Sequence, residues 1–431
     1  MLQFRVRRIL FVASPTACLN WCGVLNYMKK RLVVIGEYFP PRLGGGRRLF
    51  EIMKRLSTKY DIRFIVVPPS YVTFIRKIEF VTNKEKQIFC ENMIGYNIGL
   101  PRLILKLWRK RFLLPYMLTM MHLFFKVMKK LIELKPSTII IDAPSPYSGL
   151  LGAICGRILN KKLLIEYNDM QAFYAVEMLE GKVNTFLKNV LILIEDNIIK
   201  SAWKVTAISD FVRRYASRRQ DRKDIIVIPN GVDLQVFDPR ISGTETRSQL
   251  GIGNETKLCV YAGRIEKCVG AEIVLETAKL LQKRTDIEFM IVGEGDSRMI
   301  NRLSRLGNVV LTGLVPMQSV PKYLAAADIV LVPFSNSIAS HAISPLKIFE
   351  ALAMGKPVIA RSVSGVREVI TDNYDGILIS SGPKKWASEI INLIDNPVKA
   401  LFLGENARKT ARKYEWDRLA RKFDDVINAR A

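Results

Sequence analysis

The sequence predicts an α/β protein made of two doubly wound parallel sheets. Short apolar runs alternate with helical patterns along the whole chain, which is typical of parallel α/β architecture. The length of 431 residues is enough for two domains with full cores. A stretch rich in Gly, Pro, Asp and Ser, residues 229–253, separates two such series. Two sheets joined there would face each other across a cleft, with sites at the carboxyl ends of their strands.

The expected elements divide evenly between the two halves. In the first half we expect strands at 32–36, 62–67, 138–142, 162–166, 204–207 and 225–228, and helices at 47–57, 147–159 and 210–217. In the second half we expect strands at 258–261, 288–292, 309–311, 329–332, 357–360 and 376–379, and helices at 271–283, 320–326, 345–354 and 383–394. We assign residues 28–235 and 236–396 to the two domains, and 397–431 to terminal helices that return toward the first domain.

The first 27 residues are interpreted as an extension of uncertain role. Residues 9–28 carry no charge and approach the length of a membrane span. Pro15, Asn20 and Asn26 interrupt that run, and the first expected strand follows almost immediately. The segment also lacks a small-residue cleavage pattern. We therefore expect the folded region to begin at Met28.

Charge and residue usage exclude several classes of site. The net charge is +26, and residues 1–231 alone hold 39 basic and 17 acidic side chains, a net +22. Such a field suits anionic lipid, nucleic acid or a phosphorylated partner, and the absence of a nucleic-acid motif disfavours the second. Six cysteines without a CxxC pair and two histidines argue against a zinc site, a disulfide framework or a histidine triad. We expect no metal and a reducing compartment.

Residues 101–131 frame an apolar, aromatic run with cations. The candidates for contact with an anionic membrane are Arg109, Lys110, Arg111, Phe112, Phe124 and Phe125. The charge-free centre is too short to span a bilayer, so it suits a helix lying at the interface. The alternative is a core helix with a basic exposed edge.

The stretch Ser344 to Glu350 predicts an anion site at a helix start. Ser344 suits an N-cap, and Pro345 suits the first helical position, followed by Leu346. Lys347 then lies in the first turn, where a cation is unfavourable unless an anion binds the free N–H groups. Glu350 lies one turn further on and could accept hydrogen bonds from hydroxyls. Phosphate plus polyol describes a sugar nucleotide; a surface helix with an indifferent lysine is the alternative.

Glycine-rich turns follow two of the expected strands. Gly44, Gly45 and Gly46 follow the first strand, and Gly293 and Gly295 follow a strand of the second half. Glycines there would let the backbone approach a phosphate, although flexible turns explain them as well. Neither pattern is a dinucleotide or Walker fingerprint, so we expect no nicotinamide, flavin or other cofactor.

Several motifs together, in order, resemble the retaining glycosyltransferases of family 4. They are GEYFPP at 36–41 with the glycines, VTAIS at 205–209, IPNGVD at 228–233, YAGR at 261–264, IVGEG at 291–295, ADIVLVPF at 327–334, SPLKIFE at 344–350, SGV at 364–366 and the helix at Trp416. The resemblance covers nearly everything after Met28. It implies the GT-B fold of two facing Rossmann-like domains.

The resemblance also implies roles for individual residues. Arg264, with Lys267, would neutralise the donor diphosphate, and Glu350 would hold the donor ribose. Residues 344–347 would present N–H groups to the diphosphate, and the glycines would line the donor site.

The chain departs from the family pattern at three positions. Ala342 replaces the first glutamate of a pair, and Val269 replaces a lysine. Asn168 replaces a histidine and, with Asp169, becomes an acceptor-side candidate.

The expected function is transfer of a sugar, with retention and without a metal, from a nucleotide-sugar donor. The acceptor would be a lipid-linked or membrane-proximal glycan in polysaccharide or glycoconjugate biosynthesis. The enzyme would then sit peripherally on the inner face of the cell membrane. The alternatives are a nucleotide-sugar 2-epimerase of the same fold, a catalytically inactive homologue, which Ala342 allows, and a non-enzymatic binding protein with a basic surface.

Overall fold

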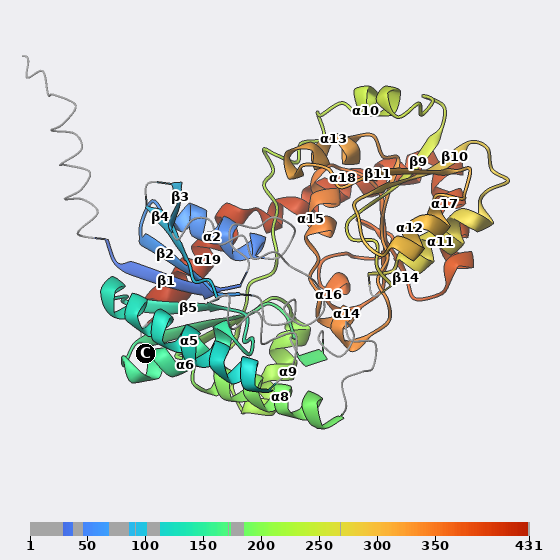
Figure 1. The fold of residues 1–431 in the computed structure, drawn as a ribbon. Coiled ribbons are helices and arrows are strands. Elements are labelled where there is room, and N and C mark those ends of the chain that lie inside the picture. The colour runs from blue at the N-terminus through green and yellow to red at the C-terminus, as the bar shows by residue number, and fades with distance from the viewer. Residues whose placement is uncertain are drawn as a thin grey trace, which may run out of the picture.

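The chain forms two parallel-sheet domains joined by one linker and by the C-terminal helices (Figure 1). The computed structural model describes residues 29–37, 46–68, 86–90, 92–100, 113–170, 172–173, 185–267 and 269–429. Both domains have the doubly wound form that the alternating sequence pattern predicts.

The first domain is built on an eight-stranded sheet of order β3-β4-β2-β1-β5-β6-β7-β8. Its strands are β1 (Arg31–Gly36), β2 (Asp61–Val66), β3 (Lys86–Cys90), β4 (Met93–Asn97), β5 (Thr138–Asp142), β6 (Lys162–Tyr167), β7 (Lys204–Ala207) and β8 (Ile226–Val227). Its helices are α2 (Arg47–Leu56), α5 (Leu113–Leu134), α6 (Ser148–Ile158), α8 (Thr185–Lys200) and α9 (Asp210–Gln220). Every neighbouring pair is parallel except β3 with β4, which is antiparallel.

The second domain is built on a six-stranded parallel sheet of order β11-β10-β9-β12-β13-β14. Its strands are β9 (Lys257–Ala262), β10 (Ile287–Val292), β11 (Val309–Gly313), β12 (Ile329–Val332), β13 (Val358–Arg361) and β14 (Ile377–Ile379). Its helices are α10 (Thr244–Gln249), α11 (Ala271–Leu280), α12 (Ser297–Leu303), η1 (Met317–Ser319), α13 (Val320–Ala325), α14 (Ile338–Ala342), α15 (Leu346–Ala353), α16 (Ser364–Arg367) and α17 (Pro383–Asp395). The chain ends with α18 (Pro397–Ala411), η2 (Arg412–Tyr414) and α19 (Trp416–Asn428).

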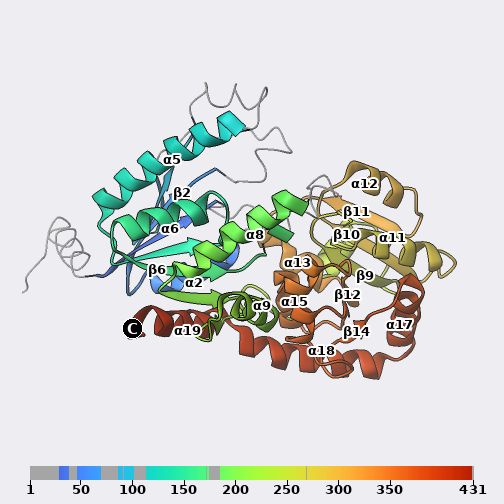
Figure 2. The ribbon, with the colours of Figure 1, turned by 90° about the horizontal axis from the view of Figure 1, so that it is seen from below.

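Each sheet is covered on both faces, which explains why the central strands read as continuous apolar runs. In the first domain α5, α6 and α8 pack on one face around Leu123, Leu151 and Ile198 (Figure 2). On the other face, α2 and α19 supply Ile52 and Phe423.

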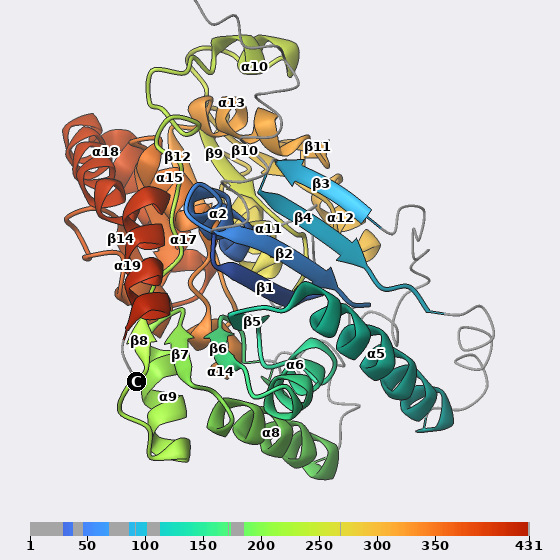
Figure 3. The same ribbon diagram turned by 90° about the vertical axis from the view of Figure 1, so that its left-hand side faces the viewer.

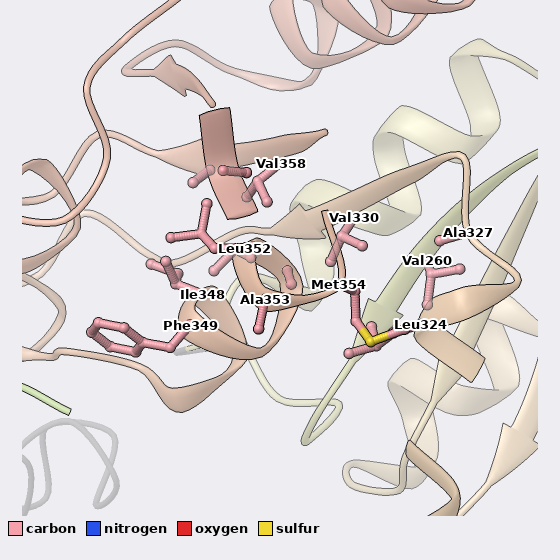
Figure 4. Close-up of a cluster of buried hydrophobic side chains, with 14 of the residues drawn as sticks. Val260, Leu324, Ala327, Val330, Ile348, Phe349, Leu352, Ala353, Met354 and Val358 are labelled. Atoms are coloured by element: carbon pink, nitrogen blue, oxygen red, sulfur yellow. The ribbon is translucent and has the colours of Figure 1, made fainter. Parts of the chain in front are cut away.

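Helix α15, which opens the SPLKIFE motif, is fixed by the core of the second domain. Ile348, Leu352 and Ala353 are fully buried on its inner side and belong to a cluster with Val260 and Val330 (Figure 4). Because this face is packed, the position of the helix start is set by the sheet below it.

Helix α19 belongs to the second half of the sequence but packs against the first domain. Trp416, Leu419 and Phe423 are buried in one cluster with Leu32 and Ile62 of the first sheet. Figure 3 shows α19 lying beside α2.

The expected strands are confirmed to within two residues at each end, and the expected helices to within three. The pair β3 and β4 was not expected. Helix α5 is a core helix along its inner face, with Leu123, Val127 and Leu131 buried. None of the helices in the described ranges is both long enough and apolar enough to cross a bilayer.

Candidate functional site

The start of α15 is the first part of the site. Pro345 is extended, with φ −74° and ψ 132°, and the helix begins at Leu346. The expectation that Ser344 caps the helix is wrong, because this extended proline separates Ser344 from the first turn. The Ser344 carbonyl accepts a hydrogen bond from Asn230, and its hydroxyl is buried without a hydrogen-bond partner in the described part of the chain.

Lys347 links the start of α15 to the loop after β9. Its Nζ lies 3.4 Å from the Tyr261 hydroxyl and 4.4 Å from the centroid of that ring. A Cβ at Gly263, where φ is +148°, would lie 2.6 Å from the same Nζ. The Tyr261 hydroxyl in turn donates to the Arg264 carbonyl at 2.5 Å. The structure therefore places Lys347 against the loop that carries Arg264, and both residues were chosen from the sequence.

The cations after β9 are accessible from solvent. Arg264 is about two-fifths exposed, at 43%, and its guanidinium pairs with Glu266. Lys267 is exposed, whereas Val269, at the usual lysine position, packs against the core of the domain. The Glu266 side chain is only 12% exposed, so an anionic ligand at Arg264 would compete with a partly shielded ion pair.

Gly293 and Gly295 are explained by contact between two loops. Gly293 has φ +143°, and a Cβ there would lie 2.0 Å from the Gly263 carbonyl oxygen. A Cβ at Gly295 would lie 2.3 Å from the carbonyl oxygen of Ile265, with which it forms a β-bridge. These two glycines thus allow backbone to pack on backbone and fix the loop that carries Arg264.

Glu350 is held by a residue of the other domain. Arg47 Nη1 donates to Glu350 Oε1 at 2.5 Å, and the two side chains are only 11% and 9% exposed. Arg47 is the first residue of α2 and follows Gly46, whose φ is 72°. Gly44 and Gly45 lie outside the described residues. Glu350 therefore stands at the junction of the two domains, within one helical turn of Lys347.

Arg48 builds the first-domain side of the same junction. It donates to both carboxylate oxygens of Glu166, at 2.7 and 3.2 Å, and to the Pro229 carbonyl at 2.5 Å. Thr206 also donates to Glu166. The side chains of Arg48 and Glu166 are 5% and 1% exposed. This buried pair ties α2 to β6 and to the linker.

Carboxylates collect at the carboxyl ends of β1, β5 and β6. Glu37, which accepts hydrogen bonds from Ser145 and Ser148, and Asp142 are buried there. Asn168 Nδ2 donates to Asp142 Oδ1 at 2.7 Å, while Asp169 is exposed. Burial, followed by repulsion from Glu166, raises the pKa of Asp142 to about 7. This edge of the first sheet is therefore acidic.

Further contacts join the domains near Ala342. Ala342 is buried in a cluster with Tyr167 and Ile208 of the first domain. Glu368 accepts hydrogen bonds from the first two N–H groups of α9, Asp210 at 2.6 Å and Phe211 at 3.0 Å. A carboxylate from the second domain thus satisfies a helix N-terminus of the first.

The membrane candidates separate into three groups. Arg109, Lys110, Arg111 and Phe112 lie outside the described residues. Phe124 is partly buried against the core of the domain, and its contact with a membrane stays a prediction. Phe125 is 65% exposed and shares the outer layer with other exposed apolar side chains of α5, α6 and α8: Met117, Met121, Ile132, Ile154, Ile158, Phe186 and Leu193.

Sequence reasoning missed two residues of this site. Arg47 follows the three glycines directly and, like Lys347, is a cation in the first turn of a helix. The argument applied to Lys347 would have identified it. Asn230, which orders Ser344 from the linker, lies in the IPNGVD motif and carried no separate chemical signal. Within the described ranges, no group of three or more His, Cys, Asp or Glu is placed to hold a metal ion.

Comparison with known proteins defines the class of this fold and site. Residues 43–236 match the family described as Glycosyltransferase Family 4, and residues 256–396 match the Glycosyl transferases group 1. These matches span most of the chain, which therefore belongs to the glycosyltransferases that the two families describe.

Curated relatives agree with this assignment. An uncharacterized glycosyltransferase of Methanocaldococcus jannaschii is 26% identical over 419 residues, covering 93% of this chain and 98% of the relative. A D-inositol 3-phosphate glycosyltransferase of Segniliparus rotundus is 29% identical over 212 residues, 46% of each protein. The chain thus matches only about half the length of the inositol phosphate relatives.

Solved structures show the same fold. Sucrose-phosphate synthase from Thermosynechococcus elongatus superposes with a TM-score of 0.73 at 18% identity, covering 93% of this chain and 98% of that one. Anabaena HepE in complex with UDP-glucose gives 0.68 at 18% identity, covering 92% and 99%. The two Rossmann-like domains therefore have the GT-B arrangement.

Proposed function

We propose that the protein transfers a sugar from a nucleoside diphosphate sugar to a membrane-proximal acceptor, with retention of the anomeric configuration. The observation that carries the proposal is that Lys347, at the start of α15, lies against the loop of Arg264, with Glu350 one turn further along the same helix. The cations of Lys347 and Arg264 suit a diphosphate, and the carboxylate of Glu350 can accept hydrogen bonds from ribose hydroxyls. HepE, a neighbour in fold, has been solved with UDP-glucose, which supports a nucleotide-sugar donor.

The chemistry requires stabilisation of a leaving diphosphate. The bond between the anomeric carbon and the diphosphate oxygen breaks, and the acceptor oxygen takes its place on the same face. Arg264 and Lys347, with the positive end of the α15 dipole, would hold the negative charge that develops. The acceptor proton would pass to the departing diphosphate, so the reaction would need no metal and no histidine.

The acceptor is proposed to lie on the side of the first domain. Asn168 and Asp169 follow β6, and Asn168 is bonded to Asp142 at the same sheet edge. Carboxylates and amides accept hydrogen bonds from sugar hydroxyls, which suits a glycan acceptor. This assignment of Asn168 and Asp169 rests on their place in the fold.

The outer layer of α5, α6 and α8 is proposed to bring this domain to an anionic membrane. Exposed Met121, Phe125 and Leu193 lie on a domain whose sequence is strongly basic. Apolar side chains among cations suit the boundary between lipid headgroups and acyl chains. The enzyme would then act on a lipid-linked glycan at the inner face of the cell membrane, in polysaccharide or glycoconjugate biosynthesis.

The decisive experiment offers the protein a panel of UDP-, GDP- and ADP-sugars and measures release of the nucleoside diphosphate. Release that depends on one donor, with the α-anomer formed from an α-linked donor, is the expected result. Inversion of the anomeric centre would contradict retention. Interconversion of the sugar without release of the diphosphate would indicate a 2-epimerase, and no reaction with any donor, with or without membrane extracts, would indicate an inactive homologue.

A further inference from the structure

Helix α2 begins with two adjacent arginines that bind carboxylates of different domains. Arg48 pairs with Glu166 inside the first domain. Arg47 pairs with Glu350 on α15 of the second domain, at 2.5 Å. Both pairs are largely shielded from water, but only the second crosses between domains.

The start of α2 makes a carboxylate partner for Arg47 favourable. Its N-cap, Gly46, provides no side-chain hydrogen bond, and no acidic residue lies in its first turn. Two cations therefore lie at the positive end of the helix dipole. Glu350 supplies the missing negative charge, and the buried Phe237 ring, 5.8 Å from the Arg47 guanidinium carbon, adds a cation–π contact. Both partners of Arg47 come from beyond the first domain.

Under the proposed function, this same carboxylate receives the donor ribose. A pair of ribose hydroxyls would then need the Glu350 carboxylate, whose Oε1 already accepts a hydrogen bond from the Arg47 guanidinium. We propose that Arg47 and the donor ribose compete for Glu350, so that the Arg47–Glu350 pair is a latch between the domains that the nucleotide opens. This inference rests on the proposed function, because it takes Glu350 as the ribose ligand.

Removal of Arg47 should therefore strengthen the binding of a ribonucleotide relative to its 2′-deoxy analogue. A shielded carboxylate that loses its cation is left uncompensated, so any hydroxyl that donates to it becomes more valuable. The effect can be isolated by comparing a nucleoside diphosphate with its 2′-deoxy analogue. Contacts to the base and to the phosphates are common to both ligands and cancel in the ratio of their dissociation constants.

The experiment measures this ratio by calorimetry for UDP and 2′-deoxy-UDP, or for whichever of UDP, GDP and ADP the wild type binds most tightly. In Arg47→Ala we expect the preference for the ribonucleotide to rise about tenfold, which is ~1.4 kcal/mol. Arg47→Lys keeps the charge but loses the fork of donors, and should give an intermediate ratio. Melting temperatures show that each variant is folded.

Arg55→Ala is the matched control. Arg55 lies on the same helix and also binds a carboxylate from outside the first domain, Asp417, which does not belong to the proposed donor site. The ratio of the two dissociation constants in Arg55→Ala should equal that of the wild type. A ratio that is unchanged or smaller in both Arg47 variants would overturn the latch while leaving the proposed function intact. Failure of the wild type to bind any of the three nucleotides would overturn the proposed function, and the latch with it.

Discussion

The two sheets present opposite charges at their carboxyl ends. In the first domain Glu37, Asp142 and Glu166 are buried at this edge. In the second domain Arg264, Lys267 and Lys347 lie near the corresponding edge. The net charges of the two halves of the sequence show the opposite trend, because residues 1–231 carry +22 of the net +26. The charge of a whole domain therefore describes its outer surface, whereas a few residues at strand ends set the charge of the site.

The contrast has a simple chemical meaning within the proposed function. A diphosphate requires cations, and hydroxyl groups that must be oriented are well served by carboxylates. The donor and the acceptor would thus meet surfaces of opposite charge. The substitutions below change one side of this contrast at a time.

The acidic edge depends most on Arg48, which is buried beside Glu166. Arg48→Ala would leave Glu166 uncompensated beside Asp142, and we expect a loss of about 3–5 kcal/mol in the free energy of unfolding. Urea denaturation followed by circular dichroism measures it. Arg302→Ala, which removes an exposed pair with Glu272, is the control and should change stability by less than about 1 kcal/mol. Equal effects of the two substitutions would show that the acidic edge does not need Arg48.

The cationic edge is tested by Arg264→Ala. Loss of a charge-assisted contact to the leaving diphosphate should raise the activation barrier by about 3 kcal/mol, which lowers turnover by roughly two orders of magnitude. Melting temperatures separate this effect from a change in stability, because the largely buried Glu266 also loses a cation. Arg298→Ala, an exposed arginine of α12, is the matched control. Wild-type turnover in Arg264→Ala would remove this residue from the mechanism.

Asp142 should make the stability of the folded protein depend on pH, which is not expected of the cationic edge. Because its pKa is raised to about 7, the folded protein holds a proton that the unfolded chain releases near pH 4. Stability should therefore fall as the pH rises from about 4 to about 7. Repulsion from Glu166, Asp169 and Glu37 adds to the free-energy cost of ionising Asp142 in the folded protein, and the hydrogen bond from Asn168 reduces this cost.

Asp142→Asn should remove the free-energy cost of ionising a buried carboxylate at this position, while keeping an oxygen that can accept the hydrogen bond from Asn168. At pH 8 we expect the variant to be more stable than the wild type by on the order of 2 kcal/mol, and at pH 3 equally stable. Denaturation midpoints across this range give the comparison. A constant difference at every pH would mean that Asp142 does not titrate in this window.

The outer surface gives the smallest expected effects. Neutralising Arg109, Lys110 and Arg111 together should remove most of the dependence of vesicle binding on anionic lipid, at about 1 kcal/mol for each charge. Met121→Ser with Phe125→Ser should weaken the part of binding that persists in high salt. Val398→Ser with Leu401→Ser, on exposed α18 of the second domain, is the control. Equal binding of the wild type and all variants to anionic vesicles would leave α5 as a core helix with a solvated edge.

The sequence predicted the regular elements well because parallel strands covered on both faces leave continuous apolar runs. Thr138 to Asp142, all buried, is an example, and its limits were predicted correctly. The pair β3 and β4 was missed because Met93 is fully buried on β4 while Ile88 on β3 is 70% exposed, so the segment lacks such a run.

The site was predicted only in part, because its contacts join residues far apart in the chain. Lys347 and Glu350 could be chosen from helix chemistry alone. Their partners, Arg47 at a separation of 303 residues and Tyr261 at 86, could not be read from spacing. The Ser344 cap failed for a local reason, since an extended Pro345 moved the helix start by one residue.

Helix α19 has a consequence for how the protein is made. Trp416, Leu419 and Phe423 complete the core that begins with Leu32 on β1, so nearly four hundred residues separate the two parts of one cluster. At about 5–20 residues per second, a ribosome needs roughly 20 to 80 seconds to reach α19 after β1 has emerged. During that time the face of the first sheet that α19 will cover stays open. The second domain, translated in between, can finish its own core before the first can, and α19, translated after it, closes the first domain.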